Sequence, residues 1–201
     1  MSTELRPIVA NFYHWEATTP DATFLRQPKG DGWKTMSYKE AGQEARSIAA
    51  ALAAMGLEGG GGVGLLSKNC YHWVLADLAI MIGGFVSVPF YASLPKKKLE
   101  EVVELSDIKG LFIGKLDSWG DKGSELSPSL KTIKFPQYAG NAEITLGESW
   151  DELVKAHEAV KGNPVPSLDD LWTIKFTSGT TGTPKGVMHI HKTPALIMSD
   201  E

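Results

Sequence analysis

Apolar strand-like segments alternate with helical segments through the middle of this chain, and this alternation constrains the fold more than any other feature. Continuous apolar runs at residues 63–67, 85–88 and 111–113 are separated by segments with helical spacing, residues 67–81 and 95–106. Strands that are apolar throughout are typical of a sheet covered on both faces. Helical crossovers between such strands make them parallel. The sequence therefore predicts an α/β fold with a mostly parallel sheet and helical crossovers.

The N-terminal third carries clear local signals. A short helix is expected over residues 8–16, and residues 22–27 and 33–36 predict a β-hairpin. Ser37 and Glu40 form a capping box, in which Ser37 caps a helix and Glu40 reaches back to the cap. The helix that follows has apolar residues at helical spacing and ends at Gly56.

Several boundaries rest on weaker signals. Asn69 or Ser67 is expected to start the helix that runs to Met81. Pro89 is expected to close the strand at residues 85–88. The helix beginning at Pro95 is expected to turn four apolar side chains inward: Leu99, Val102, Val103 and Leu105. Further on, the patterns predict strands at 131–135 and 143–145, a helix at 150–160 and a loop at 161–166.

Composition excludes several classes of protein. The 201 residues are 42% apolar and 22% charged, as in an ordinary globular protein, and the net charge of -4 gives no sign of nucleic-acid binding. Cys70 is the sole cysteine, so no intramolecular disulfide can form, and it is interpreted as a small buried residue. Residues 1–7 lack the apolar core of a signal peptide. The apolar run 74–90 is broken by polar, glycine and proline residues, so it is not a membrane span.

Three smaller features have structural interpretations that we favour over functional ones. The basic run at residues 96–98 is read as a solvated helix start because glutamates follow it, with a membrane-surface role as the alternative. The dispersed tryptophans are interpreted mostly as packing residues. His189 and His191 have metal-ligand spacing but lack a third ligand in view.

The stretch most informative about function is residues 176–186, Phe-Thr-Ser-Gly-Thr-Thr-Gly-Thr-Pro-Lys-Gly, between apolar segments at 171–174 and 187–190. Glycines let backbone N–H groups approach an anion closely. Hydroxyl groups add donors and can ligate a hard cation, and a lysine adds a mobile positive charge. These are the components of a phosphate-binding loop, whereas a plain surface hairpin would need neither the lysine nor this order of hydroxyls.

The spacing excludes a Walker loop, because Pro184 stands where its second glycine is required and Gly186 where Ser or Thr is required. Instead, residues 176–186 closely resemble the signature motif of the adenylate-forming (AMP-binding) enzymes. Scaffold stretches at 33–40, 65–89 and 111–117 resemble the long-chain fatty-acyl-CoA synthetases within that superfamily. One departure is the run of glycines at 59–62, where those enzymes usually have a Pro-Gly-Asp-Arg-like turn; it raises the flexibility expected of this turn.

The resemblance implies roles for individual residues. Lys185 would clamp the phosphates of ATP as a catalytic residue, and Pro184 would restrict the loop. Thr177 would bind both the nucleotide and Mg²⁺, and His191 would lie near the acyl or adenylate pocket. The remaining phosphate-binding positions would be Ser178, Gly179, Thr180, Thr181 and Gly182.

The resemblance also implies an activity: ATP-dependent conversion of a fatty acid to an acyl-adenylate and then to acyl-CoA, with Mg²⁺ as cofactor and coenzyme A as co-substrate. Residues 1–201 would be the N-terminal part of the AMP-binding large domain, and this segment alone would be inactive because later motifs are absent. Acyl chain length and oligomeric state stay open. The expected setting is cytoplasmic, with peripheral membrane contact left open. The alternatives are a non-catalytic truncated module and an amino-acid adenylation domain that loads a carrier protein.

Overall fold

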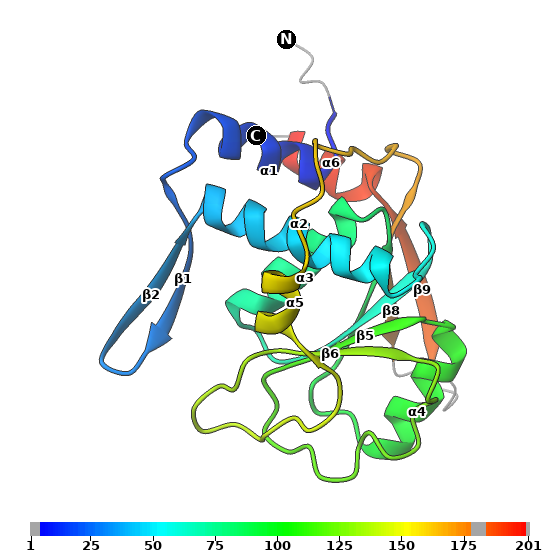
Figure 1. Ribbon diagram of the computed structural model, residues 1–201. Coiled ribbons are helices and arrows are strands. Elements are labelled where there is room, and N and C mark those ends of the chain that lie inside the picture. The colour runs from blue at the N-terminus through cyan, green and yellow to red at the C-terminus, as the bar shows by residue number, and fades with distance from the viewer. Residues whose placement is uncertain (1–4, 178–183, 200–201) are drawn as a thin grey trace.

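The protein is built around one twisted sheet with helices on both faces (Figure 1). The computed structural model describes residues 5–177 and 184–199. The helices are α1 (Ile8–Thr18), α2 (Tyr38–Ala54), α3 (Tyr71–Ile82), α4 (Lys96–Ser106), α5 (Trp150–Ala156) and α6 (Lys192–Ser199). The strands are β1 (Thr23–Lys29), β2 (Gly32–Ser37), β3 (Gly62–Leu66), β4 (Val86–Phe90), β5 (Gly110–Ile113), β6 (Lys131–Lys134), β7 (Glu148–Ser149), β8 (Leu171–Thr177) and β9 (Lys185–Ile190).

The strand order of the main sheet is β7-β6-β5-β3-β4-β8-β9. Every neighbouring pair is parallel except β8 and β9, which form an antiparallel hairpin at one edge. Strands β1 and β2 form a separate antiparallel hairpin outside this sheet. The predicted α/β class with a mostly parallel sheet is therefore confirmed.

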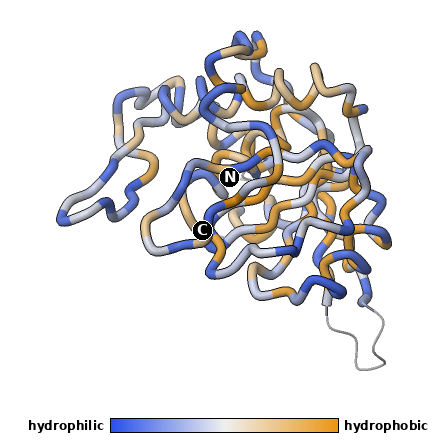
Figure 2. Tube along the Cα trace, turned by 60° about the horizontal axis from the view of Figure 1, so that its bottom comes forward, coloured by the Kyte–Doolittle hydropathy of each residue, from blue (hydrophilic) through white to orange (hydrophobic). Residues whose placement is uncertain are grey.

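Two apolar cores lie on the two faces of the sheet. Helices α1, α2, α3 and α5 contribute to the larger one, which includes the fully buried Phe112 and Trp150. Helix α4 and the segments around it cover the opposite face, through Leu99 and Val102. Figure 2 shows the apolar colouring concentrated along the central strands. Both faces of β3 and β5 are thus withdrawn from water, as their continuous apolar sequences predict.

The capping box is present as predicted. The Ser37 hydroxyl accepts a hydrogen bond from the Glu40 N–H at 3.2 Å, and the Glu40 carboxylate accepts one from the Ser37 N–H at 2.7 Å. Beyond the other end of α2, Gly56 adopts a φ of 82°, which glycine enters without strain. Local sequence therefore sets both ends of α2.

The glycine run at 59–62 forms a hydrogen-bonded turn. Gly60 has a φ of 80° and donates its N–H to the Gly84 carbonyl at 2.8 Å. Gly61 donates to Glu58 and accepts from Val86, so the turn is tied to the start of β4. Glycine is required here for its backbone angle at Gly60.

Three predictions of element bounds are wrong. Helix α3 begins at Tyr71 with Cys70 as its N-cap, because the Ser67 hydroxyl bonds Lys115 and Lys68 instead of capping a helix. Helix α5 ends at Ala156, and Val160 donates its N–H to the Arg46 carbonyl of α2. Residues 143–145 form no strand; the pairing starts only at Glu148, after Gly147 turns the chain with a φ of 104°.

The prediction of which α4 side chains face the core is also only partly right. Leu99 and Val102 are buried, whereas Leu105 is 51% exposed. The helix ends one residue later, and Asp107 takes a left-handed conformation with a φ of 49°. This turn brings Ile108 into the core at the place that Leu105 was expected to fill.

No helix within residues 5–177 and 184–199 has both the length and the apolar character needed to cross a membrane.

Candidate functional site

A cleft of about 670 Å³ lies where the parallel strands β3, β4 and β5 end. Segments immediately after these strands line it, including Ser67, Tyr91 and Lys115, and β8 closes it on the other side through Lys175 and Phe176. The carboxyl ends of parallel strands are the usual position of ligand sites in open α/β sheets. The topology alone therefore makes this edge the candidate site.

Pro89 interrupts the hydrogen bonding between β4 and β8 beside the cleft. The prediction that Pro89 closes its strand is wrong, since it lies inside β4 opposite Leu65 of β3. Val86 donates its N–H toward β3, so by alternation Ser87 and Pro89 face β8. Pro89 has no N–H to donate. The β4–β8 pairing accordingly lies at Ser87 and Thr173, and Pro89 lines the cleft together with Lys175 and Phe176 of β8.

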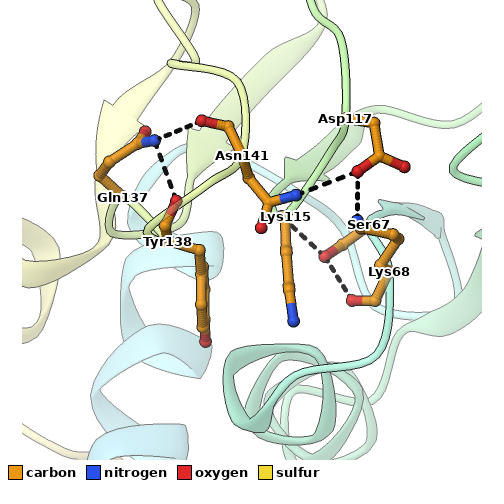
Figure 3. A network of polar contacts seen from close by, with 7 residues as sticks. All are labelled: Ser67, Lys68, Lys115, Asp117, Gln137, Tyr138 and Asn141. Atoms are coloured by element: carbon orange, nitrogen blue, oxygen red, sulfur yellow. Dashed lines mark hydrogen bonds and ion pairs between the residues drawn. The ribbon is translucent and has the colours of Figure 1, made fainter. Parts of the chain in front are cut away.

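A polar network supports one wall of the cleft (Figure 3). The Ser67 hydroxyl accepts from the Lys115 N–H at 2.9 Å and donates to the Lys68 carbonyl at 2.8 Å. The Lys68 ammonium pairs with Asp117, which also accepts from Asn141 at 3.3 Å. These bonds join the ends of β3 and β5 to the segment that contains Tyr138. They hold Lys68 and Lys115 in place at the wall of the cleft.

The lining of the cleft is cationic. Lys68, Lys115 and Lys175 line it, and no Asp or Glu is among its described lining residues. The Lys115 ammonium lies 5.5 Å from the centre of the Tyr138 ring, and Figure 3 shows it pointing along that ring. The Lys175 ammonium has the same relation, also 5.5 Å, to Trp172. Lysines that rest on aromatic rings keep their charge available to an anionic ligand.

A buried histidine stands behind the Tyr138 ring. His72 of α3 is 3% exposed, and its Nδ1 lies 2.7 Å from the Tyr138 hydroxyl. Burial, together with the nearby Lys34, lowers the pKa of His72 to about 3. Burial is also the main cause that raises the pKa of Tyr138. Both side chains are therefore neutral near pH 7. Their contact fixes the Tyr138 ring, over which the Lys115 ammonium lies.

The two ends of the predicted phosphate loop meet at the cleft edge. Thr177 ends β8, Lys185 begins β9, and the two residues pair across the hairpin. The Thr177 hydroxyl donates to the Lys185 carbonyl at 3.5 Å, which leaves its oxygen lone pairs free, and both side chains are exposed. Such a hydroxyl fits as one oxygen ligand of Mg²⁺. The structure thus brings together the predicted metal ligand and the predicted phosphate clamp.

The other predicted phosphate-binding positions, Ser178, Gly179, Thr180, Thr181 and Gly182, lie outside the described residues. Pro184 is the first described residue after them and is half-buried. The loop therefore leaves β8 directly after the cleft-lining residues Lys175 and Phe176.

A buried polar chain attaches the β8–β9 hairpin to the core. The Thr173 hydroxyl donates to the Ser87 carbonyl at 2.8 Å, and the Ser87 hydroxyl donates to the Asp77 carboxylate at 2.6 Å. Burial raises the pKa of Asp77, opposed by its hydrogen bond from Ser87 and by the charge of Lys175. These hydrogen bonds connect α3, β4 and β8 beside the cleft.

His191 lies at the far end of the hairpin from Lys185. It follows β9, whose last residue Ile190 pairs with Leu171 at the start of β8. At about 3.3 Å per strand residue, that is roughly 20 Å from the Thr177–Lys185 pair. His191 is 3% exposed, its Nδ1 has no hydrogen-bond partner among the described residues, and burial lowers its pKa. It lines a separate pocket of about 430 Å³ with Asp170 and Val86.

The cleft lysines were not predicted from the sequence. Lys68 and Lys115 each follow a predicted parallel strand by one or two residues. The rule that ligands bind at the carboxyl ends of such strands would have found both. Lys175 lies within β8 and gave no comparable signal, because its place in the cleft depends on β8 lying beside β4.

Comparison with known proteins shows the family of the chain. The sequence matches the AMP-binding enzyme family over residues 12–198, so the chain belongs to that family. It is 34% identical over 189 residues to fatty acyl-CoA synthetase A of Dictyostelium discoideum, covering 85% of this chain and 28% of the relative. It is 31% identical over 173 residues to long chain acyl-CoA synthetase 1 of Arabidopsis thaliana, covering 81% of this chain and 26% of that protein. The chain thus spans about a quarter of the length of these curated relatives.

A solved structure shows the same fold. The anthranilate CoA ligase AuaEII, in complex with anthranoyl-AMP, superposes with a TM-score of 0.75 at 19% identity. The match covers 94% of this chain and 36% of the ligase. The arrangement of α1 to α6 around the sheet is therefore that of the matching part of an adenylate-forming enzyme.

Proposed function

We propose that this chain supplies the phosphate-binding part of an AMP-forming acyl-CoA synthetase that acts on a fatty acid. The observation that carries this proposal is the 176–186 motif, whose ends Thr177 and Lys185 are paired at the edge of a cationic cleft. The acyl-CoA synthetase relatives support the fatty-acid class. We also propose that residues 1–201 form the N-terminal part of the AMP-binding large domain, with the phosphate loop at 176–186.

The proposed reaction has two steps. A fatty-acid carboxylate oxygen attacks the α-phosphorus of ATP, forming an acyl–phosphate bond and releasing pyrophosphate. The thiol of coenzyme A then attacks the acyl carbon, loses its proton to solvent and displaces AMP. Negative charge builds up on the leaving pyrophosphate in the first step, so donors and cations directed there lower the barrier most.

The residues of the motif would have separate roles in the first step. Lys185 would place an ammonium group at the exit of the loop, where it clamps the phosphates without taking part in proton transfer. Thr177 would supply one oxygen ligand to Mg²⁺, and the bound ion would neutralise phosphate charge. Ser178, Gly179, Thr180, Thr181 and Gly182 would contribute backbone N–H and hydroxyl donors to the phosphates.

Lys185→Ala tests the role of the loop. In the full-length protein that carries this segment, ATP–pyrophosphate exchange should slow at least about ten-fold, the scale of losing one charged transition-state contact. Lys192→Ala is the matched control, because Lys192 is an exposed lysine at the opposite end of β9. An unchanged exchange rate in Lys185→Ala would refute the assignment.

A panel of acids tests the substrate class separately. Hexadecanoic acid should support exchange better than acetate, benzoate or phenylalanine in the same assay. Exchange with amino acids alone would replace the fatty-acid proposal with carrier-protein loading and leave the phosphate loop intact. No exchange with any carboxylic acid would favour a non-catalytic module.

A further inference from the structure

The β1–β2 hairpin projects from the body of the protein toward one side (Figure 1). It stands clear of the body in the second view as well, where its turn is hydrophilic (Figure 2). A lone two-stranded ribbon is only marginally stable in water. This one is held on one face near its middle, where the Lys34 ammonium donates to the Tyr71 hydroxyl at 2.6 Å and Gln27 accepts from the Tyr71 N–H at 3.1 Å.

The face of the hairpin that does not contact Tyr71 carries an exposed aromatic and cationic pair. Pro28 pairs with Trp33 and Arg26 pairs with Thr35, so these four side chains share one face. Trp33 is 60% exposed, and the Arg26 guanidinium lies 4.9 Å from the centre of its ring. Unlike the buried Trp119 and Trp150, Trp33 does not pack in a core.

The charge of this segment is opposite to that of the whole chain. The hairpin, residues 23–37, holds three basic residues and one acidic residue, a net +2, whereas the chain carries -4. The basic residues are Arg26, Lys29 and Lys34, and the acidic residue is Asp31. Within the described part of the chain, Arg26 and Lys29 make no ion pair. Their charge is therefore available to an anionic partner.

The basic run at 96–98 is the membrane-surface alternative that the sequence offers. Unlike Arg26 and Lys29 of the hairpin, two of its lysines form ion pairs. Lys96 pairs with Asp121 and Glu125, and Lys98 pairs with Glu101. Acidic neighbours thus offset the positive charge of these two lysines. The hairpin is the stronger candidate because it combines unpaired cations with an exposed tryptophan.

We propose that the β1–β2 hairpin binds the surface of an anionic lipid bilayer. Trp33 would enter the interface between headgroups and acyl chains, the region that tryptophan prefers. Arg26 and Lys29 would contact the anionic headgroups. The partner is a bilayer because the exposed face offers an apolar ring together with diffuse positive charge.

The position of the hairpin gives this contact a consequence. Tyr71, which anchors the hairpin, is two residues from both Asn69 and Trp73, which line the cationic cleft. The hairpin and the cleft are therefore connected through the start of α3. The vesicle binding proposed here does not depend on the proposed function.

Vesicle co-sedimentation of the full chain tests the proposal. Vesicles of phosphatidylglycerol and phosphatidylcholine should bind the chain, and vesicles of phosphatidylcholine alone should bind it weakly. Lys29→Glu should weaken binding on the order of ten-fold, since each basic residue near an anionic surface contributes about five-fold. Trp33→Ala should weaken it several-fold, and binding should decline as salt rises.

Two matched variants control for residue type. Trp15→Ala removes a tryptophan that is 50% exposed on α1, and Lys161→Glu reverses an exposed lysine outside the hairpin. Both should bind anionic vesicles like the parent chain. The proposal is overturned if hairpin and control variants bind equally, if neutral vesicles bind as well as anionic ones, or if the parent chain binds no vesicles. Binding to DNA or polyglutamate without vesicle binding would also overturn it. Unfolding midpoints equal to that of the parent would show that the variants fold.

Discussion

The centre of the main sheet and its β8–β9 edge are stabilised in different ways. Strands β3 and β5 are buried on both faces, and Phe112 of β5 has no exposed surface. Strand β9 is largely exposed, with Met188 at 69%. The edge strand that follows the candidate phosphate loop thus contributes little to the core. Residues there can satisfy the needs of a ligand without a large loss of packing.

The largest expected effect is in the centre of the sheet. Phe112→Ala would leave a cavity next to Phe135 and Trp150, whose ring centres lie 6.0 and 5.8 Å from that of Phe112. Such truncations cost roughly 3–5 kcal/mol of unfolding free energy. Val187→Ala on β9 should cost less than about 0.5 kcal/mol, because Val187 is 44% exposed. Urea unfolding of both variants measures the contrast, and equal losses would contradict it.

The same contrast decides what could be predicted from the sequence. The strands of the centre and helix α2 were found because apolar runs and the Ser37–Glu40 capping box are local patterns. The place of Pro89 inside β4 was missed because a proline usually ends a strand. Lys175 was missed because it meets Lys115, 60 positions earlier in the sequence, only after folding.

The phosphate loop is the opposite case. Its composition indicated phosphate binding before any fold was known, because glycines, hydroxyls and a lysine in that order have few other uses. The structure adds the pairing of Thr177 with Lys185 at the cleft edge. The position of His191, far along the hairpin from that pair, could not be inferred from its place after the second strand, since the direction of β9 carries it away from the cleft.

A second prediction concerns the pH dependence of the centre. Burial lowers the pKa of His72 to about 3 in the folded state, so the side chain stays neutral down to about pH 3. An unfolded histidine takes up a proton near pH 6.5. Below pH 6.5 the unfolded state therefore binds more protons, and stability falls as pH falls. The expected loss between pH 7.5 and pH 5 is about 2 kcal/mol, at 1.36 kcal/mol per pH unit below 6.5.

Two variants isolate this contribution from other titrating groups. His72→Gln should remove most of the loss between pH 7.5 and pH 5, measured by urea unfolding at each pH. His14→Gln should keep it, because His14 is exposed on α1. Burial also lowers the pKa of His191, so some slope of the same sign should remain in His72→Gln. Parallel profiles for the parent and His72→Gln would show that His72 is not the source.

The smallest expected effect concerns the attachment of the hairpin to the centre. Thr173→Val removes the hydroxyl that donates to the Ser87 carbonyl in a buried position, and a bond of this kind contributes about 1 kcal/mol. Because β4 and β8 pair at Ser87 and Thr173, the lost stability should appear as local opening of the β8–β9 hairpin. Amide hydrogen exchange should speed up about five-fold in β8 and β9 and stay unchanged in β3 and β5. Thr35→Val, on the exposed strand β2, should change neither region. If exchange rises equally in all strands, the hairpin opens only with global unfolding, and the two regions form one cooperative unit.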